Sequence, residues 1–241
     1  MSAAALTIEA LAPLLPTKAR LIGVDLGAKT MGLALSDVER RIATPLTTLK
    51  RVKFGRDADA LAFARNADAY RNVLLVEQPN GNFADTIVRG YFYDAWAHAH
   101  LGALAHSSDE RVAAIAAKAR KEVTYHLRRS EDWLIRLGDG TELSHERVQR
   151  AVDELWRYTG ELFLGDEIDA AMVEQGIGVD PAILRELWLE RVSPALRTAT
   201  LVQPSDGWMQ RGGKQGRHSE ALSYMLAEMQ VLPRSYPGAT W

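Results

Sequence analysis

The chain has 241 residues, of which 47% are hydrophobic and 25% charged, enough to bury a substantial core as one large domain or two small ones. Its 29 basic and 31 acidic residues give a formal net charge of −2, so no overall field draws it to nucleic acid or to an anionic membrane. It has no cysteine, which excludes disulfides, thiolate metal sites and a cysteine nucleophile, and which fits a reducing compartment. We therefore expect a cytoplasmic protein.

The N-terminal residues have the pattern of β-structure. The apolar stretch Ala3–Leu15 contains charge and proline and follows no basic leader, so it predicts neither a signal peptide nor a membrane span. Leu21–Gly27 is a short apolar strand that contains one carboxylate, Asp25, and ends in a glycine turn. Met31–Asp37 is typical of the returning strand of a hairpin, and the threonine-rich Ile42–Leu49 predicts a third strand.

A long helix is predicted to begin after Asn82. Asn82 can accept from the first free amides as the N-cap, and Asp85 places a negative charge in the first turn, where it is favourable. The apolar run before it, Val73–Gln78, predicts a short helix rather than a strand. Apolar residues then recur at spacings of three and four and predict one broad buried face: Phe83, Ile87, Val88, Tyr91, Phe92, Ala95 and Trp96.

Helical patterns also dominate the rest of the chain. Ser144 is the expected N-cap of one helix, Asp166–Gln175 predicts a short one, and a third begins at Asp180 and is kinked or ended by Pro194. Between the long helix and Ser144 lies a second long apolar stripe: Val112, Ile115, Ala116, Ala119, Val123, Leu127, Trp133, Leu134 and Leu137.

The first segment resembles a nuclease family. The motifs GVDLGAKTMGLALSD at residues 23–37 and IATPLTTLK at residues 42–50 are similar to those of the YqgF/RuvX family of RNase H-like nucleases. The resemblance implies that Asp25 helps to hold catalytic magnesium. Cleavage with two metal ions requires several converging carboxylates, and the later carboxylate motifs of that family do not occur downstream. The alternative is that Asp25 caps a glycine turn, and the missing ligands favour this interpretation.

The remainder resembles a different family over most of the chain. Its motifs are NVLLVEQPNGNFADTI at residues 72–87, AKARKEVTYHLR at 117–128, LWRYTGELF at 155–163 and LAEMQ at 226–230. They are similar to those of the PaaC family, the scaffold subunits of bacterial ring 1,2-phenylacetyl-CoA epoxidases. The resemblance implies a ferritin-like helical fold, a cytoplasmic multicomponent monooxygenase, and assembly with a homologous di-iron catalytic subunit.

The sequence does not supply the ligands of a di-iron site. Such a site in a helical bundle uses Glu-x-x-His twice, with a further glutamate from each of two other helices. The weak candidates are Glu122 and His126, a single pair that favours a structural hydrogen bond or ion pair. Glu142 and His145 have the literal spacing, but the pair straddles the expected helix start at Ser144. We therefore expect no metal ligands, no bound cofactor and no catalytic residue.

Other polar and aromatic residues have similar alternatives. Asp94 and His98 form another lone pair, and His98 and His100 should point to different sides of a helix, where packed or solvated side chains are favoured. The segment Gly212–His218 resembles a phosphate cradle but follows no strand and lacks the P-loop spacing. Five tryptophans are expected as core or interface anchors rather than as a cofactor box: Trp96, Trp133, Trp156, Trp188 and Trp208.

Together these patterns predict a mainly α protein, an incomplete ferritin-like helical bundle preceded by a small RNase H-like fragment that contains a β-hairpin. We expect residues 1–60 to form the fragment and residues 61–241 to form the PaaC-like domain without its first two helices. The expected function is a non-catalytic structural subunit of a phenylacetyl-CoA epoxidase in phenylacetate degradation, so whether the chain is itself an enzyme is left open. Expected partners are the di-iron subunit and homo- or hetero-oligomers, with no membrane and no nucleic acid. The alternatives are a magnesium-dependent nuclease, inactive through truncation, and a remnant with neither activity.

Overall fold

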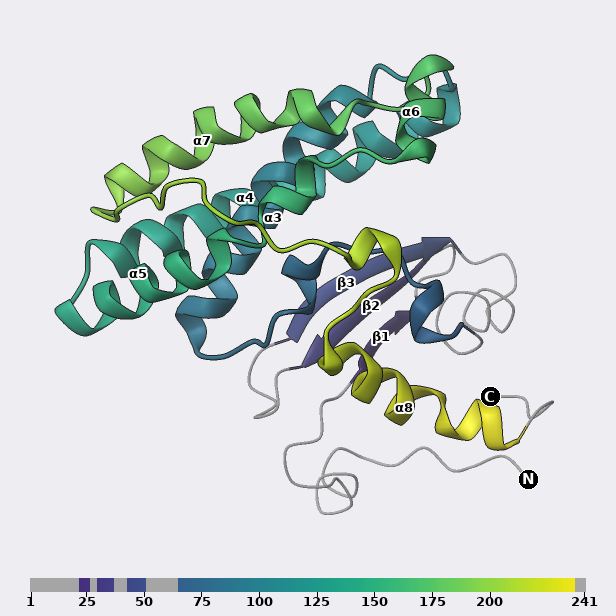
Figure 1. Ribbon diagram of the computed structural model, residues 1–241, viewed down its shortest axis with the longest axis horizontal. Coiled ribbons are helices and arrows are strands. Elements are labelled where there is room, and N and C mark those ends of the chain that lie inside the picture. Colours follow the sequence, from purple (N-terminus) through teal and green to yellow (C-terminus); the bar gives the residue numbers. More distant parts are fainter. Residues whose placement is uncertain (1–21, 27–29, 37–42, 51–64, 237–241) are drawn as a thin grey trace. The chain divides into compact units, whose positions relative to one another are not determined.

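The computed structural model describes residues 22–26, 30–36, 43–50 and 65–236, the first three ranges as backbone only (Figure 1). The chain divides into two compact units, one formed by Met1–Ala64 with Leu232–Trp241 and the other by Arg65–Val231. None of the helices in these ranges combines the length and apolar character that a membrane span requires.

The three strands form an antiparallel sheet in the order β1-β2-β3. β1 (Ile22–Leu26) pairs with β2 (Thr30–Ser36), which pairs with β3 (Ala43–Lys50). Asp25 lies in β1 with Gly32 as its Cα partner, and the register of β2 against β3 shifts between Leu33 and Ala34. The predicted hairpin and third strand are thus confirmed.

The helices confirm the expected fold class, mainly α with an incomplete ferritin-like bundle that follows the hairpin-containing segment in the sequence. A short 3-10 helix at Leu74–Glu77 confirms the prediction for that apolar run. The α-helices are α3 (Phe83–Leu104), α4 (Glu110–Gly138), α5 (Glu142–Trp156), α6 (Glu167–Glu174), α7 (Leu184–Thr198) and α8 (Glu220–Ser235).

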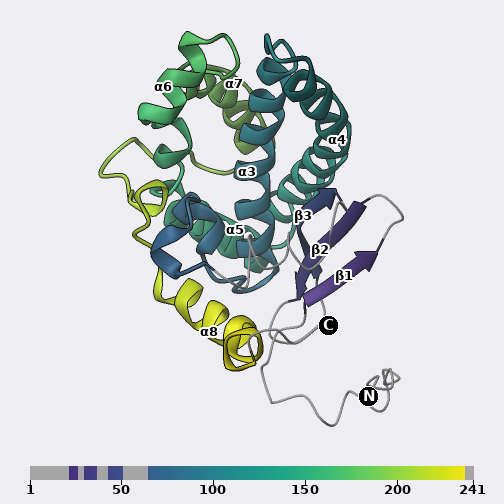
Figure 2. The ribbon, with the colours of Figure 1, turned by 90° about the vertical axis from the view of Figure 1, so that its right-hand side faces the viewer.

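α3 is the central helix of the bundle, with α4, α5 and α7 packed around it (Figure 2). It starts with a capping box in which the Asn82 side chain accepts from Ala84 N at 2.8 Å and Asp85 accepts from Asn82 N at 2.7 Å. Burial then recurs at the predicted spacing: Ala84, Ile87, Val88, Tyr91, Phe92 and Ala95. The expected absence of the first two helices would remove possible partners of this face, but in the structure α4, α5 and α7 cover it.

Aromatic side chains from α3, α5 and α7 form the centre of the core. The ring of Phe92 lies edge to face against Trp156 and Trp188, with centroids 5.6 Å apart in both pairs. Trp188 also donates from Nε1 to the carbonyl of Phe92 at 2.9 Å, which satisfies its one polar atom. Trp156 and Trp188 are therefore core anchors, as predicted. Trp208, in contrast, is 73% exposed and contributes nothing to this core.

The structure corrects one predicted helix start and decides how another predicted helix continues. Thr141, not Ser144, is the N-cap of α5, because the Thr141 hydroxyl accepts from Ser144 N at 3.3 Å, while the Ser144 hydroxyl donates back to the carbonyl of Leu137 at 2.7 Å. α7 runs through Pro194 to Thr198, so of the two predicted outcomes, a kink or an end, the proline does not end the helix. The different start of α5 arises because the Ser144 hydroxyl bonds to the end of α4, a partner that local sequence spacing does not specify.

One residue of the predicted α4 stripe is also misplaced. Ile115 is 68% exposed, whereas Ala116, Leu127 and Leu134 are buried. The buried face of α4 follows a line displaced from Ile115, and Tyr125, 67% exposed, lies on the same outer side as Ile115. α4 therefore keeps part of its apolar surface in solvent.

Candidate functional site

The weak metal-ligand candidates lie on α4 and do not converge. Glu122 is exposed and His126 is half-buried, and the nearest interaction of His126 is electrostatic, with Asp94 on α3. Within the described ranges, no group of three or more His, Asp or Glu side chains is arranged to hold a metal ion. The described residues of this chain do not fit a di-iron site of the bundle type, which needs six such ligands facing one another.

Asp94 is the carboxylate most perturbed by burial on the α3–α4 face. Its Oδ2 lies 2.9 Å from the hydroxyl of Ser130 on α4. Burial raises the pKa of Asp94 to about 6, and the hydrogen bond from Ser130 and the charge of His126 only partly oppose this. The Ser130 hydroxyl has one hydrogen and two nearby acceptors, because it also lies 3.0 Å from the carbonyl of His126. When Asp94 is protonated, it can donate to the Ser130 oxygen while Ser130 donates to that carbonyl. Burial thus shifts this carboxyl group toward its neutral form relative to an aspartate in water.

The remaining histidines have packing or helix-end roles. His100 stacks on Trp96 with ring centroids 5.0 Å apart, whereas His98 faces a surface cavity, so the two point to different sides as predicted. Burial and the charges of Arg120 and Arg191 lower the pKa of His98. Glu142 and His145 both lie in α5, whereas the expected helix start at Ser144 would have left Glu142 outside the helix. His145 Nδ1 lies 2.7 Å from the carbonyl of Gly138, so it closes the end of α4 instead of facing a metal.

The cavity at His98 lies between α3, α4 and α7 and has a volume of about 250 Å³. Its walls are mostly polar: His98, Thr124, Leu127, Arg128, Glu131, Asp132 and Arg191. Arg191 donates from Nε and Nη2 to one oxygen of Glu131, at 3.0 and 2.7 Å, and this ion pair joins α7 to α4. The volume is below the roughly 300 to 1,000 Å³ typical of small-molecule sites, and the lining charges nearly cancel.

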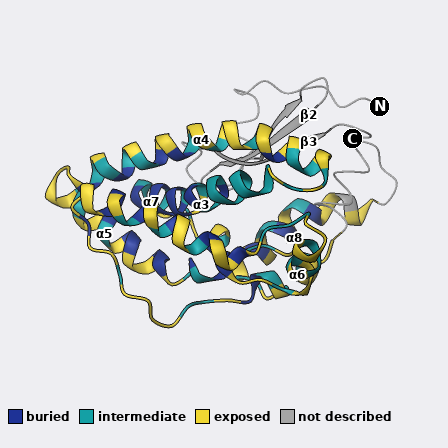
Figure 3. Ribbon diagram, turned by 90° about the horizontal axis from the view of Figure 1, so that it is seen from above, coloured by how far each residue is buried: buried dark blue, intermediate teal, exposed yellow. Residues whose placement is uncertain are grey.

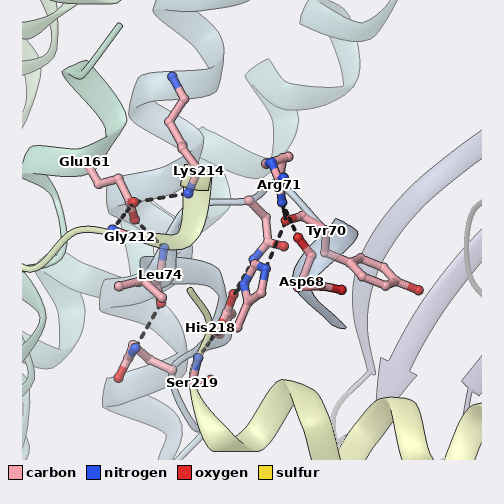
Figure 4. A network of polar contacts seen from close by, with 12 residues as sticks. Asp68, Tyr70, Arg71, Leu74, Glu161, Gly212, Lys214, His218 and Ser219 are labelled. Carbon is pink, nitrogen blue, oxygen red and sulfur yellow. Dashed lines mark hydrogen bonds and ion pairs between the residues drawn. The ribbon is translucent and has the colours of Figure 1, made fainter. Parts of the chain in front are cut away.

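The buried polar centre of this unit is Glu161, in a short 3-10 helix at Gly160–Phe163 (Figure 4). Its side chain is about 1% exposed and accepts from three backbone amides. Leu74 N donates at 2.7 Å, Gly212 N at 2.7 Å and Lys214 N at 3.2 Å. A buried carboxylate is tolerable only with such donors, and here they come from segments far apart in the sequence.

A second carboxylate, Glu77, ties the start of α8 to the same region. It lies 2.5 Å from His218 Nδ1, and it accepts from Ser219 N at 2.6 Å and from Asn72 Nδ2 at 2.6 Å. The Glu77 and His218 side chains are each 4% exposed. His218 Nε2 lies 2.9 Å from the carbonyl of Tyr70, so both ring nitrogens have a partner within the fold.

The glycines of the loop before α8, Gly212 and Gly213, are required by its close packing in this network. A Cβ on Gly213 would lie 2.1 Å from the carbonyl oxygen of Asn72, and Gly212 has a φ of +137° that side chains rarely adopt. Lys214 Nζ pairs with Asp169 at 2.8 Å. The amides and the lysine that suggested a phosphate cradle are therefore bound to carboxylates of this chain, Glu161 and Asp169.

Sequence reasoning missed Glu161 and Glu77 as anchors. Both lie in the motifs quoted for the second family, but neither was given a role. The available signal was a lone glutamate between a glycine and Leu162-Phe163, an apolar context in which an unpaired charge is costly. The side chain of Asp25, the alternative nuclease residue, lies outside the described side chains, and the interpretation that it caps a glycine turn stays a prediction.

Comparison with known proteins finds relatives of both kinds, and the match to the second family extends into residues 1–60. Residues 43–241 match the family described as phenylacetic acid catabolic protein. Over 218 residues the chain is 48% identical to the PaaC component of the 1,2-phenylacetyl-CoA epoxidase of Escherichia coli strain K12, an alignment that covers 90% of this chain and 87% of that protein.

The N-terminal segment is similar to proteins described as pre-16S rRNA nucleases. Identity is 59% over 61 residues with the one from Beijerinckia indica, which covers 25% of this chain and 37% of that protein. It is 59% over 58 residues with the one from Methylocella silvestris, 24% of this chain and 36% of that protein. The chain thus spans little more than a third of the length of these nuclease relatives.

Proposed function

The chain belongs to the phenylacetic acid catabolic protein family, and on that premise we propose that it is a non-catalytic structural subunit of a phenylacetyl-CoA epoxidase. In this role it supports the di-iron subunit that carries out the reaction in phenylacetate degradation. The observation that carries the proposal is the 48% identity to the PaaC component of a known epoxidase across 90% of the chain.

The chemistry of the described side chains supports a structural role. The buried carboxylates of Glu161 and Glu77 are occupied by amides and by His218, and Asp94 accepts a hydrogen bond from the Ser130 hydroxyl. None of these groups is held open toward a common point, as the ligands of a catalytic metal would be. The buried polar groups instead fix loops and helix ends, which is what a subunit that provides a rigid surface requires.

We further propose that the chain consists of two parts, an RNase H-like fragment at residues 1–60 and a ferritin-like domain at residues 61–241 that lacks its first two helices. The division into compact units after Ala64 supports a boundary near this point. A bundle without these helices would form homo- or hetero-oligomers to complete its packing, and the di-iron subunit is the proposed hetero-oligomeric partner.

The proposal is tested by co-expression with the di-iron subunit of the same organism. We expect one complex after affinity purification on a tag on this chain and after gel filtration, with the iron recovered on the partner. Metal analysis of the separated chains locates the iron. Failure of the wild-type chain to bind the catalytic subunit, or stoichiometric iron on this chain alone, would refute the proposal.

A second candidate function is supported by the nuclease similarity of the N-terminal segment. In this alternative Asp25 takes part in magnesium-dependent cleavage of structured RNA or DNA. Because the chain spans little more than a third of those relatives, we propose that this activity is absent. Cleavage of precursor ribosomal RNA by the wild-type chain, lost in Asp25→Asn, would establish it instead. Cleavage that survives Asp25→Asn would point to a contaminating nuclease.

A further inference from the structure

The outer face of α4 carries a regular seam of exposed residues. They recur at alternating spacings of four and three along the helix: Arg111, Ile115, Lys118, Glu122, Tyr125, Arg129, Asp132 and Arg136. This is the spacing at which one helix presents a continuous line to a second, nearly parallel helix. Every one of them is exposed, and Figure 3 shows such residues along the full length of α4. At about 1.5 Å per residue the seam is roughly 38 Å long.

The seam includes large apolar side chains and four cations, of which only Arg129, whose charge lowers the pKa of Asp94, and Arg136, 5.8 Å from the centroid of the Trp133 ring, interact with another side chain within the described ranges. Ile115 and Tyr125, 68% and 67% exposed, are large apolar side chains left in solvent. Among the residues the structure describes, Lys118 and Arg129 form no ion pair or hydrogen bond through their side chains. Four seam positions are basic and two acidic, and Lys121 and Arg128 on the flank add positive charge.

We propose that this seam is the docking surface for an acidic amphipathic helix of another protein subunit. The inference rests on the proposed function, because it takes that subunit to be the di-iron partner. Carboxylates of the partner helix meet the cations of the seam, and its apolar side chains cover Ile115 and Tyr125. Charge complementarity of this kind sets orientation and partner choice, while the two apolar residues contribute buried area.

A second copy of this chain is a poor occupant of the seam. Antiparallel pairing of two α4 helices about the seam centre places Arg111 opposite Arg136 and Lys118 opposite Arg129, cation against cation. Parallel pairing in register places each cation opposite itself. Like charges directly opposite one another are unfavourable in both arrangements, so the partner has to differ in charge.

Nucleic acid is also disfavoured as the occupant. Glu122 and Asp132 interrupt the line of cations, and both would meet phosphate groups with like charge. The exposed Ile115 has no counterpart on a phosphate backbone. A protein helix differs from a phosphate backbone in both respects: it can place carboxylates only opposite the four cations and neutral or basic residues opposite Glu122 and Asp132, and its apolar side chains can cover Ile115.

The test measures binding of the full-length chain to the purified di-iron subunit by titration calorimetry. The variant is Lys118→Glu with Arg129→Glu, and the control is Arg147→Glu with Arg211→Glu, two exposed cations away from the seam that also lack ion pairs in the described ranges. We expect the seam variant to bind at least about tenfold more weakly, because like charges then face each other. The control variant should bind within about twofold of wild type, because its substitutions lie away from the seam. It has the same net charge as the seam variant, so it measures the effect of overall charge alone.

Further measurements separate the possible outcomes. Unchanged circular dichroism and melting temperature of the seam variant show that it folds. Ile115→Ala with Tyr125→Ala should also weaken the complex. Higher salt should lower the affinity for the di-iron subunit only in proteins that retain the seam cations. Equal binding by wild type and the seam variant overturns this inference but leaves the proposed function intact, whereas no binding by wild type overturns both. Binding of a duplex oligonucleotide that only the seam variant loses, with protein binding unchanged, also overturns it.

Discussion

At the scale of single residues, buried charge in this protein is bound by backbone amides from distant segments. Glu161 holds Leu74, Gly212 and Lys214, which lie 87, 51 and 53 residues away in the sequence. We expect Glu161→Gln to lower the free energy of unfolding by on the order of 2 to 4 kcal/mol. A glutamine has one acceptor oxygen, and its amide group would turn hydrogens toward an amide that also donates.

Chemical denaturation of purified wild type and Glu161→Gln measures this difference. Glu228→Gln is the matched control, because Glu228 lies on α8, is exposed and has no hydrogen-bond partner among the described residues. We expect the control to change stability by less than about 0.5 kcal/mol. A loss of equal size in both variants would show that the amide contacts of Glu161 contribute little.

The raised pKa of Asp94 predicts a pH-dependent stability. Its folded pKa of about 6 exceeds the ordinary value of 3.8, so between these pH values the folded protein binds more protons at this site than the unfolded chain. This contribution to stability is present below about pH 4 and is lost as the pH rises through 6. Asp94→Asn removes the charge, and it should be more stable than wild type at pH 7.5 by on the order of 1 to 2 kcal/mol, a figure reduced for partial exposure.

Urea denaturation of both proteins from pH 4 to pH 8 tests the Asp94 prediction. The advantage of Asp94→Asn should shrink toward zero near pH 4, where the wild-type carboxyl is protonated. Asp132→Asn, which removes an exposed carboxylate of α4, supplies the baseline for loss of one charge. A difference that stays constant across this range would mean that burial of Asp94 does not disfavour its charge.

At the scale of elements, the glycine-rich loop packs directly on the backbone near Asn72. Gly213→Ala would place a Cβ 2.1 Å from the Asn72 carbonyl oxygen and 3.1 Å from Leu74 N. Because the clash is with backbone, we expect a loss of about 1 to 3 kcal/mol in the free energy of unfolding. Gly207→Ala is the control, since a Cβ there meets nothing within 4 Å. Equal melting temperatures for the two variants would contradict this packing.

Local sequence patterns predicted the elements whose ends are fixed by local hydrogen bonds. Asn82 is the N-cap as predicted and forms a capping box with Asp85, and the short helix predicted from Asp166 begins with a second capping box, which Asp166 forms with Asp169. The start of α5 was misjudged because Ser144 and Thr141 are both good caps, and contact with the end of α4 decides between them. Periodicity also placed Ile115 on the buried stripe of α4, because it indicates the apolar side of a helix but not how far neighbouring helices cover the edges of that side.

The buried polar network was less predictable for a physical reason. Glu77 reaches His218 and Ser219, 141 and 142 residues further along the chain, and no local pattern specifies such pairs. The segments that carry both carboxylates were nevertheless found as motifs, since they are quoted for the family resemblance. What the sequence supplied was the location of important segments, and the structure supplied the contacts that make them important.

At the scale of the whole molecule, the proposed loss of the first two helices raises the question of which apolar surfaces of the bundle need a partner. α3 buries its apolar face against α4, α5 and α7, which accounts for a folded centre. The outer seam of α4 keeps Ile115 and Tyr125 exposed, and such residues forfeit about 1.5 to 3 kcal/mol each when left in solvent. Stability should therefore depend on a partner that covers them, or on self-association through another surface.

We expect the melting temperature of this chain to rise with the concentration of the di-iron subunit. A partner that binds only the folded chain contributes about 2.7 kcal/mol at one hundred times its dissociation constant. For a chain of this size that corresponds to a rise of roughly 5 to 10 °C. Sedimentation of the chain alone should show oligomers or dye-accessible apolar surface. A stable monomer with no exposed apolar surface, and with a melting temperature that the partner does not change, would mean that the chain is complete without either.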